Sequence, residues 1–575
     1  MTTIELTHKF VVGIDFGTTY SGFAWASVEQ PDEVRGYNDW ENQPSNTPYC
    51  KTITSIRYRR EPDGTYTPVY WGGELIEIKK FKLWFNPETP RDGLPEDMNW
   101  MRPSIDYLRF ISNQALEVLR HRFFDLDKND VLWCITVPAI WDERAKNLVR
   151  QAATLAGIVN DSNQNSLCII LEPEAAALYT LKAVSELSSK SGSTYMILDA
   201  GGGTVDLTTH TITGNSGMFR SDSNGSSAQG GRKGLAEAPR LTEASRGTGA
   251  LCGSTYVDKS FLKFFRAQIG TEHFNEMKRK RPELLAALLQ EWERAKRDFL
   301  GPPPPGQEPV PEIIPFPAGM LQFVSDETKQ RWIDEQDTEE ELHVPVEQMM
   351  EIFHEPVNEC LKLVQEQLES IGGQCDYLVL VGGFSSSRYL CKRVNERFAP
   401  YFRKIVVPLD PTAAVVQGAV VYGLDPSRIQ VRRCRYSYGY ISNIAITDID
   451  RYAERDVWQN EAGERFVRVF KCLVAENQEV KANEEFFSSA YPMYATQTRA
   501  QVRLVATPMR LEPGRCFSYR MVRDVTELGI LATDVPTHLP NRLVNIRYLF
   551  GQTELKAIAT IVATGQEQQM SLVIE

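Results

Sequence analysis

The chain has 575 residues, of which 42% are hydrophobic, 10% aromatic and 24% charged, and this composition excludes wholesale disorder. At about 100–200 residues per domain, its length predicts roughly three to five compact units. The formal net charge of −12 disfavours a constitutive nucleic-acid binder, because the surface of such a protein is usually basic. We therefore expect an acidic, globular protein that does not bind nucleic acid.

The ten cysteines are spread along the chain without a Cys-x-x-Cys pair. This spacing predicts reduced thiols rather than a zinc site or a disulfide framework. The segment from Met1 to Phe10 lacks the apolar stretch of a secretory signal, and no apolar run reaches the ~18–20 residues that a membrane span needs. We expect a cytoplasmic protein with no membrane span, and the nucleus is the alternative location.

The first strong element is a buried strand over 10–15 that ends in an aspartate. A tight turn over 16–22 follows, and strand-like residues resume at 23–26, so the segment predicts a hairpin. Further along, the pattern predicts a strand at 131–137 and an amphipathic helix at 142–149. A third strand at 168–171 leads through Glu172, Pro173 and Glu174 into a helix at 175–181.

The hairpin pattern then occurs a second time. A strand over 195–199 ends in Asp199, a Gly/Thr turn covers 200–204, and a return strand covers 205–209. The two aspartates, Asp15 and Asp199, are about 184 residues apart. The repetition predicts two similar α/β lobes that face one another, although a local resemblance of this kind can also arise by chance.

Two stretches interrupt the compact pattern. Residues 214–234 are rich in Gly and Ser, which predicts a flexible insert, and residues 301–311 form a proline-rich connector. A strand at 377–381 with a helix to 394, and then a strand at 405–409 followed by a turn and a helix within 410–424, complete the α/β part. Beyond residue 427 short alternating segments predict β structure, so we place a domain boundary there.

The two turns carry a specific chemistry. Glycines let a backbone approach an anion closely, and successive N–H groups in such turns form a concave anion site. A carboxylate at the mouth of this site is reasonable if Mg²⁺ and its waters lie between it and a phosphate. Two facing hairpins would then hold the phosphates of a nucleotide. The alternative role for Asp15 and Asp199 is the capping of a turn. The sequence contains neither a Walker-type nor a Rossmann-type glycine motif.

Seven motifs occur in order over roughly residues 9–427: VVGIDFGTTYSGFAWA, ITVPAIWDERAKNLVRQAA, ILEPEAAAL, MILDAGGGTVDLTT, WERAKRDF, LVLVGGFSSSRYL and DPTAAVVQGA. In this order they resemble the actin-like ATPase superfamily, and specifically the heat shock protein 70 family in its divergent member 12 branch. The resemblance implies an α/β fold: a two-lobed, ribonuclease-H-like ATPase domain with a nucleotide cleft, followed by a β-rich C-terminal domain. It also implies ATP or ADP with Mg²⁺ as cofactors.

The resemblance implies a role for each matching residue. The first phosphate loop would consist of Asp15, Gly17, Thr18, Thr19 and Tyr20, and the second of Gly201, Gly202, Gly203, Thr204 and Asp206. Asp15 and Asp199 would hold Mg²⁺ through water. The adenosine would lie between a helix carrying Glu293, Lys296 and Arg297 and a loop carrying Gly382, Gly383, Ser385 and Arg388. The alternative for the helix is an amphipathic surface helix.

Three residues match catalytic positions of that family. Glu172 matches the carboxylate that orients the attacking water, a task that Asp199 could share, and Lys82 is the best match for the lysine that contacts the γ-phosphate. The competing interpretations are a helix cap for Glu172 and a solvated lysine for Lys82. No covalent nucleophile is needed, because positioning and charge stabilisation suffice for phosphoryl transfer to water.

The expected domains are a nucleotide-binding domain at 9–427, with lobes at about 9–198 and 199–427, and a β-rich domain at 428–575. The second domain would be a degenerate substrate-binding domain without a helical lid. The segment that joins them, DPSRIQVRR at 425–433, is basic, whereas the family usually has an acidic, leucine-rich linker. The chain also ends without the acidic tetrapeptide that docks co-chaperones in the family.

Three functional classes follow from these features. The first is an ATPase that acts as a chaperone, monomeric, with peptide or unfolded clients and with nucleotide-exchange or J-domain-type co-chaperones. The second is a nucleotide-dependent sensor or scaffold that hydrolyses ATP slowly or not at all. The third is a sugar or metabolite kinase on the same fold, which the motif order disfavours.

Deleting residues 214–234 is expected to leave folding and nucleotide binding intact. The segment has too little apolar surface to offset the entropy of ordering it. Thermal melts and calorimetric titration of the deletion variant check this prediction. A melting temperature lowered by more than a few degrees would show that the segment packs against the rest of the protein.

Overall fold

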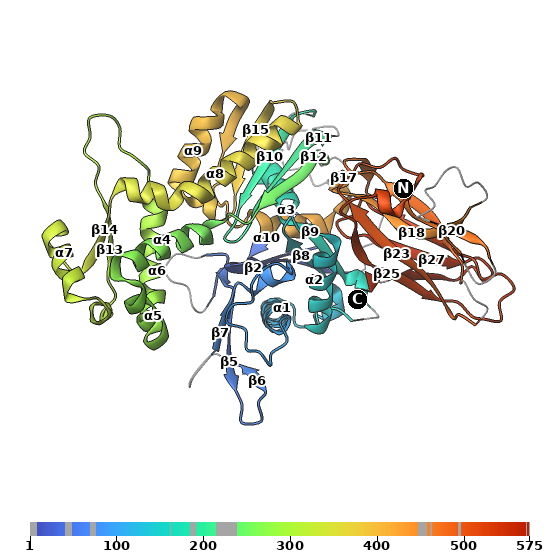
Figure 1. Cartoon of the computed structure of the whole chain (residues 1–575), viewed down its shortest axis with the longest axis horizontal. Coiled ribbons are helices and arrows are strands. Elements are labelled where there is room, and N and C mark those ends of the chain that lie inside the picture. Colours follow the sequence, from blue (N-terminus) through green and yellow to red (C-terminus); the bar gives the residue numbers. More distant parts are fainter. Residues whose placement is uncertain are drawn as a thin grey trace, which may run out of the picture.

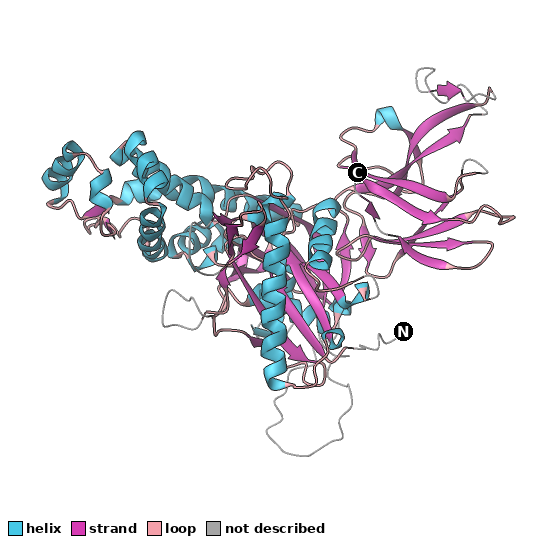
Figure 2. Cartoon of the chain, turned by 90° about the horizontal axis from the view of Figure 1, so that it is seen from below, coloured by secondary structure: helices cyan, strands magenta, loops and turns pink. Residues whose placement is uncertain are grey.

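A computed structural model of the chain describes residues 8–40, 49–69, 76–160, 163–183, 191–213, 239–446, 457–459, 463–492, 496–570 and 572–573. The predicted insert at 214–234 lies outside these residues. The structure is mixed α/β, with helices gathered toward one end of the molecule and strands toward the other (Figures 1 and 2). Within the described ranges, every helix is too short or too polar to span a bilayer.

The first predicted hairpin is the centre of a mixed sheet of order β3-β2-β1-β8-β9, with β4 paired to β2. Its members are β1 (Phe10–Asp15), β2 (Tyr20–Ser27), β3 (Arg35–Gly36), β4 (Thr52–Ile53), β8 (Val131–Val137) and β9 (Leu167–Leu171). The return strand begins at Tyr20, three residues earlier than predicted, because Tyr20 and Ser21 already pair with β4. Helices α1 (Arg102–Arg122) and α2 (Glu143–Leu155) cover this sheet through a shared apolar core.

The second predicted hairpin is the centre of a sheet of order β16-β15-β10-β11-β12-β17-β21. Its members are β10 (Thr194–Ala200), β11 (Val205–Thr213), β12 (Arg240–Ala250), β15 (Cys375–Val381), β16 (Phe402–Val406), β17 (Ile429–Arg433) and β21 (Glu479–Lys481). Strand β17 comes just after residue 427, where we placed a domain boundary. It runs parallel to β12 and antiparallel to β21, so the linker segment is an integral strand of this sheet.

Two helices lie between the sheets and connect them. Helix α3 (Glu172–Ala183) begins at Glu172, three residues before the predicted start, and α10 (Ala414–Leu424) packs directly on it. A Cβ atom at Gly418 would lie 1.7 Å from the carbonyl oxygen of Ala175, so only glycine permits this crossing. The apolar cluster around the two helices contains side chains from both sheets, for example Val11 and Ile197.

The remaining helices pack on the second sheet or extend from it (Figure 1). They are α4 (Ser254–Ile269), α5 (Thr271–Lys280), α6 (Pro282–Asp298), α7 (Asp326–Gln336), α8 (Val346–Ser370) and α9 (Arg388–Phe398). Two small sheets accompany them, made of β13 (Glu312–Pro315) with β14 (Glu341–Val344), and of β5 (Ser55–Arg60), β6 (Tyr66–Pro68) and β7 (Ile76–Lys79).

The described residues after Arg433 contain no α-helix. Most of their strands form one sheet of order β19-β20-β18-β23-β25-β29, with β24 beside β20, and another of order β22-β26-β27-β28. The strands are β18 (Ser437–Ala445), β19 (Val457–Gln459), β20 (Arg465–Val474), β22 (Glu485–Ala490), β23 (Arg499–Thr507), β24 (Cys516–Ser518), β25 (Thr526–Asp534), β26 (Val544–Leu549), β27 (Lys556–Ile561), β28 (Glu567–Met570) and β29 (Leu572–Val573). The two sheets share one apolar core, which includes Leu504 and Tyr548.

Candidate functional site

The tips of the two predicted hairpins touch each other. A Cβ atom at Gly202 would lie 2.2 Å from the Thr19 hydroxyl oxygen, and one at Gly203 would lie 2.6 Å from the Thr18 hydroxyl oxygen. The glycines are therefore required by the close approach of the two turns. This contact brings together residues about 184 positions apart in the chain.

Both turns are fixed by local hydrogen bonds. In the first, the Gly17 amide donates to the Ser21 hydroxyl over 3.1 Å, and in the second the Gly201 amide donates to the carbonyl of Thr204 over 2.9 Å. The amides at the start of α4 bind the second turn as well: those of Ser254 and Thr255 donate to the carbonyls of Gly201 and Gly202. The backbone of the two turns is thus held in place before any ligand binds.

Four carboxylates are buried beside these turns. Asp15 and Asp199 end β1 and β10, Asp206 is the cross-strand partner of Asp199, and Glu172 begins α3. Burial raises the pKa of Asp199 well above its ordinary value, and repulsion from Glu172 adds to this effect. Burial likewise raises the pKa of Asp206. The set therefore holds more negative charge than the buried environment favours.

Lys82 offsets part of this charge. It lies in the short 3-10 helix at Phe81–Phe85, is 1% exposed, and forms an ion pair with Glu172. Its ammonium group also lies 5.6 Å from the centre of the Trp141 ring. Burial raises the pKa of Glu172 to about 7, and Lys82 limits this rise by attraction. A lysine in this position is not the solvated surface lysine of the alternative interpretation.

Sequence reasoning missed a second lysine. Lys51 pairs with Asp15 across 2.5 Å, and the Thr136 hydroxyl donates to the other oxygen of that carboxylate over 3.4 Å. Lys51 belongs to none of the seven motifs, and only the pairing of β4 with β2 brings it to the site. No local signal in the sequence could have identified it.

The residues predicted to wall the adenosine form an ion-pair network on α6. Lys296 is 4% exposed, and its ammonium group contacts Glu293 over 2.5 Å and Asp258 over 2.8 Å, while Arg297 pairs with Glu293 over 2.8 Å. The phenol of Tyr20 lies in the field of these charges, and burial together with Glu293 raises its pKa. The first hairpin therefore faces α6, and Asp258 on α4 is a further member that the sequence did not reveal.

In the predicted loop after β15, Gly382 lies against the carboxylate set, whereas the other predicted residues do not. Gly382 has a φ of 85°, and a Cβ atom there would lie 2.5 Å from a carboxylate oxygen of Asp199, so this backbone closes one side of the carboxylate set. The hydroxyl of Ser385 is used within the loop, where it donates to the carbonyl of Val381 over 2.6 Å. Gly383 and Arg388 are exposed.

The arrangement fits a magnesium-bound nucleotide. Within the described ranges, no three His, Cys, Asp or Glu side chains are grouped so that they could ligate a metal directly. The Thr19 hydroxyl and one oxygen of Asp206 are buried without a hydrogen-bond partner. Unpartnered polar atoms beside two glycine turns are suited to a polar ligand.

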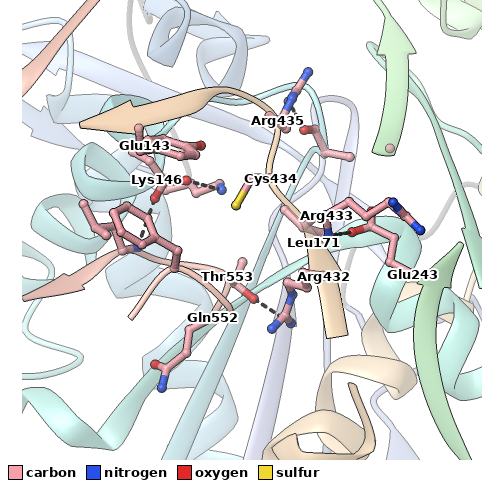
Figure 3. A pocket seen from close by; sticks show the side chains of 15 residues that line it. Glu143, Lys146, Leu171, Glu243, Arg432, Arg433, Cys434, Arg435, Gln552 and Thr553 are labelled. Atoms are coloured by element: carbon pink, nitrogen blue, oxygen red, sulfur yellow. Dashed lines mark hydrogen bonds and ion pairs between the residues drawn. The ribbon is translucent and has the colours of Figure 1, made fainter. Parts of the chain in front are cut away.

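A separate cavity of about 60 Å³ lies where the linker strand meets the C-terminal strands (Figure 3). Arg432 lies on its wall and donates to both oxygens of Glu174, over 2.6 and 3.0 Å, and to Gly551 and Thr553. Glu174 is only two residues from Glu172 on α3. One buried arginine thus joins the helix that carries Glu172 to the C-terminal strands.

Other contacts strengthen this junction. Arg150 on α2 makes two hydrogen bonds of 2.6 Å to Glu554, and the Leu555 amide donates to Glu143 over 3.1 Å. Glu243 accepts a hydrogen bond from the Arg433 amide, yet burial raises its pKa to about 7. Within the basic linker that departs from the family pattern, Ile429 and Arg432 are buried and Arg432 is held by hydrogen bonds to three residues.

No family model matches the chain. It is 26% identical to human heat shock 70 kDa protein 12B and 25% identical to human heat shock 70 kDa protein 12A. These similarities cover 99% and 98% of the chain and 91% of each relative. A chaperone protein HscA homolog of Bordetella petrii is 29% identical over 42% of the chain and 40% of its own length.

These similarities bear on the family resemblance and on the mixed α/β fold. The chain is thus similar over nearly its full length to two proteins of the heat shock 70 kDa type, and its structure is mixed α/β. The predicted resemblance to the member 12 branch of that family is confirmed.

The Lys82–Glu172 pair is open to a direct test. Lys82→Met leaves Glu172 buried without its counter-ion, so we expect a loss of about 3 kcal/mol in the free energy of unfolding. The double variant Lys82→Met/Glu172→Gln should recover most of that loss, because it removes both charges. Urea unfolding at pH 7.5 measures both. Lys79→Met, in an exposed pair with Glu77, is the control and should change little. Equal effects of the Lys82 and Lys79 variants would contradict the prediction.

Proposed function

We propose that this protein is a Mg²⁺-dependent ATPase of the heat shock 70 kDa type that binds ATP and ADP between two lobes. The observation that carries the proposal is the contact between the Gly202–Gly203 and Thr18–Thr19 turns beside buried carboxylates. The lobes would be built on the two sheets that contain these hairpins, with α3 and α10 between them.

The hairpins would bind the phosphates of the nucleotide, and other elements would bind its adenosine. The amides and hydroxyls of the two turns would bind the phosphates, and Asp15 and Asp199 would hold Mg²⁺ through its waters. When bound, the metal would offset the negative charge of the phosphates. The network on α6 and the backbone at Gly382 would flank the adenosine.

Hydrolysis would depend on Glu172 and Lys82. Glu172 would orient a water molecule and accept its proton, and its pKa of about 7 places it close to the range in which a base works best. Lys82 would hold Glu172 in position and add positive charge near the terminal phosphate. No covalent intermediate on the protein is required.

The C-terminal strands would bind peptide or unfolded-protein clients under the control of the nucleotide. The proposal is supported by the Arg432–Glu174 pair, because a shift of α3 at Glu172 would also move the partner of Arg432. Clients would then be handled in the cytoplasm or nucleus, with co-chaperones of the nucleotide-exchange or J-domain type.

The second candidate is a nucleotide-dependent sensor or scaffold with slow or no turnover. It is favoured by the same junction, since breaking a buried ion pair is costly and would restrain movement of the C-terminal strands. ATP turnover with and without unfolded peptide separates the candidates. Stimulation by peptide supports the chaperone, and unstimulated single-turnover hydrolysis supports the sensor. No binding of ATP or ADP in the presence of Mg²⁺ would overturn both.

Glu172→Gln is expected to lower turnover by ~10²-fold and to leave ATP affinity near that of the wild type. In the wild type, the rate should rise as pH increases through about 7, because only ionised Glu172 accepts the proton. The variant should lose this rise. Single-turnover kinetics over pH 6–9, with thermal melts on the same samples, measures both effects. A stability loss of about 1 kcal/mol with an unchanged rate would instead assign Glu172 to helix capping.

Arg432→Met tests the coupling between the two parts of the chain. It leaves Glu174 buried without its counter-ion, so we expect a loss of about 3 kcal/mol in the free energy of unfolding, which thermal melts on the same samples measure. The phosphate turns and Glu172 are not substituted, so the basal ATP turnover of the folded protein should stay within about twofold of the wild type. Stimulation by unfolded peptide should be lost, because the variant removes the hydrogen bonds that join α3 to Gly551 and Thr553. Arg515→Met, in an exposed pair with Glu512, is the control. Full stimulation of the Arg432 variant would show that coupling takes another route.

A further inference from the structure

The fold brings Lys51 to Asp15 by a specific set of strand pairings. Strand β4 pairs with β2 so that Thr52 lies opposite Ser21 and Ile53 opposite Tyr20. Continuing this register by one residue places Lys51 beside Gly22, and Gly22 is in turn the cross-strand partner of Asp15. The lysine therefore approaches the end of β1 from the far side of the hairpin.

Gly22 provides the space through which the Lys51 side chain passes. A Cβ atom at Gly22 would lie 3.1 Å from Cγ of Lys51 and 2.3 Å from the carbonyl oxygen of Cys50. The segment is also anchored to the hairpin, since the Thr54 amide donates to the Thr19 carbonyl over 2.8 Å. A glycine on one side and this anchor on the other make Lys51 a fixed part of the site.

The ion pair with Asp15 is shielded from water. The side chain of Lys51 is 10% exposed and that of Asp15 is 5% exposed, so little solvent screens the attraction. Lys51 also attracts Asp199, the second aspartate assigned to Mg²⁺. Its ammonium group thus acts on both carboxylates that a divalent cation would use.

The charges of the whole set explain why a second lysine matters. Among the described residues, the ion pairs of the four buried carboxylates Asp15, Glu172, Asp199 and Asp206 are two, one with Lys82 and one with Lys51. When all are ionised, two negative charges remain in excess, which one divalent cation would balance. Without Lys51 the excess would be three.

We propose that Lys51 is a resident counter-cation of the phosphate site, which competes with a divalent metal for Asp15 and partly replaces it in binding the nucleotide phosphates. The metal part of this inference needs only the residues at the site, and the nucleotide part rests on the proposed function. Lys51 is a positioning residue: it sets the charge that Asp15 presents.

The first experiment uses Mn²⁺ alone as the probe, without nucleotide. Electron paramagnetic resonance titration of Lys51→Met should show Mn²⁺ affinity raised by about tenfold over the wild type, because the competing ammonium group is gone. Lys51→Arg should bind Mn²⁺ as the wild type does. The control is Lys9→Met, which removes the exposed partner of Asp130 near the other end of β1 and should change nothing. Equal Mn²⁺ affinity of the wild type and Lys51→Met would overturn the proposal.

A second pair of variants covers the case in which Lys51→Met does not fold. Asp15→Asn keeps the ammonium group, and Asp15→Asn/Lys51→Met removes both charges of the pair. The double variant should bind Mn²⁺ more tightly than Asp15→Asn, because Lys51 no longer repels a cation near Asp199. Equal affinities of these two variants would likewise overturn the proposal.

The second experiment measures ADP binding by calorimetry with the divalent metal chelated. Without metal, the wild type should still bind ADP, with lower affinity than in the presence of Mg²⁺. The metal-free ADP affinity of Lys51→Met should be about tenfold lower than that of the wild type, and that of Lys51→Arg should equal it. Unchanged metal-free affinity of Lys51→Met would refute the phosphate-binding role. Absence of ADP binding by the wild type even with Mg²⁺ would overturn the proposed function, whereas the Mn²⁺ result would still decide whether Lys51 competes for Asp15.

Discussion

The site depends on the burial of four carboxylates beside two glycine turns. Such a cluster is unfavourable by itself, and burial accordingly raises the pKa of Asp199 and Glu172. Lys82 and Lys51 reduce this cost, each through one ion pair with a different carboxylate of the set. The remaining negative charge favours a cation beside these carboxylates.

The charged side chains can meet only because the backbones of the two hairpins approach each other closely. Gly202 and Gly203 permit the contact with Thr18 and Thr19, and Gly418 permits α10 to cross α3. Each of these positions would clash with a side chain as small as alanine. The glycines of the phosphate turn and the glycine of α10 therefore have the same effect: each allows the two sheets to come close together.

The junction around Arg432 extends this organisation to the C-terminal strands. Glu172 and Glu174 share one turn of α3, so a single helix carries the carboxylate assigned to hydrolysis and the carboxylate that binds Arg432 of the linker. Proteins with a flexible linker can separate the two functions in space. Here the linker is strand β17 of the second sheet, so the two parts of the chain share backbone hydrogen bonds as well as ion pairs.

The sequence by itself determined the two hairpins, because an apolar strand that ends in Asp and a Gly/Thr turn is a local pattern. It also pointed to Glu172 through the motif ILEPEAAAL and to Lys82 through a shorter local match. It could not determine the roles of Lys51, Asp258 or Arg432, since each is placed by pairing or packing with residues far away in the chain. The basic linker departs from the family pattern in sequence, and only the tertiary structure showed that one of its arginines, Arg432, is buried against Glu174. The physical reason is that these ion pairs join residues far apart in the chain, so they form only when the tertiary structure brings their strands and helices into contact.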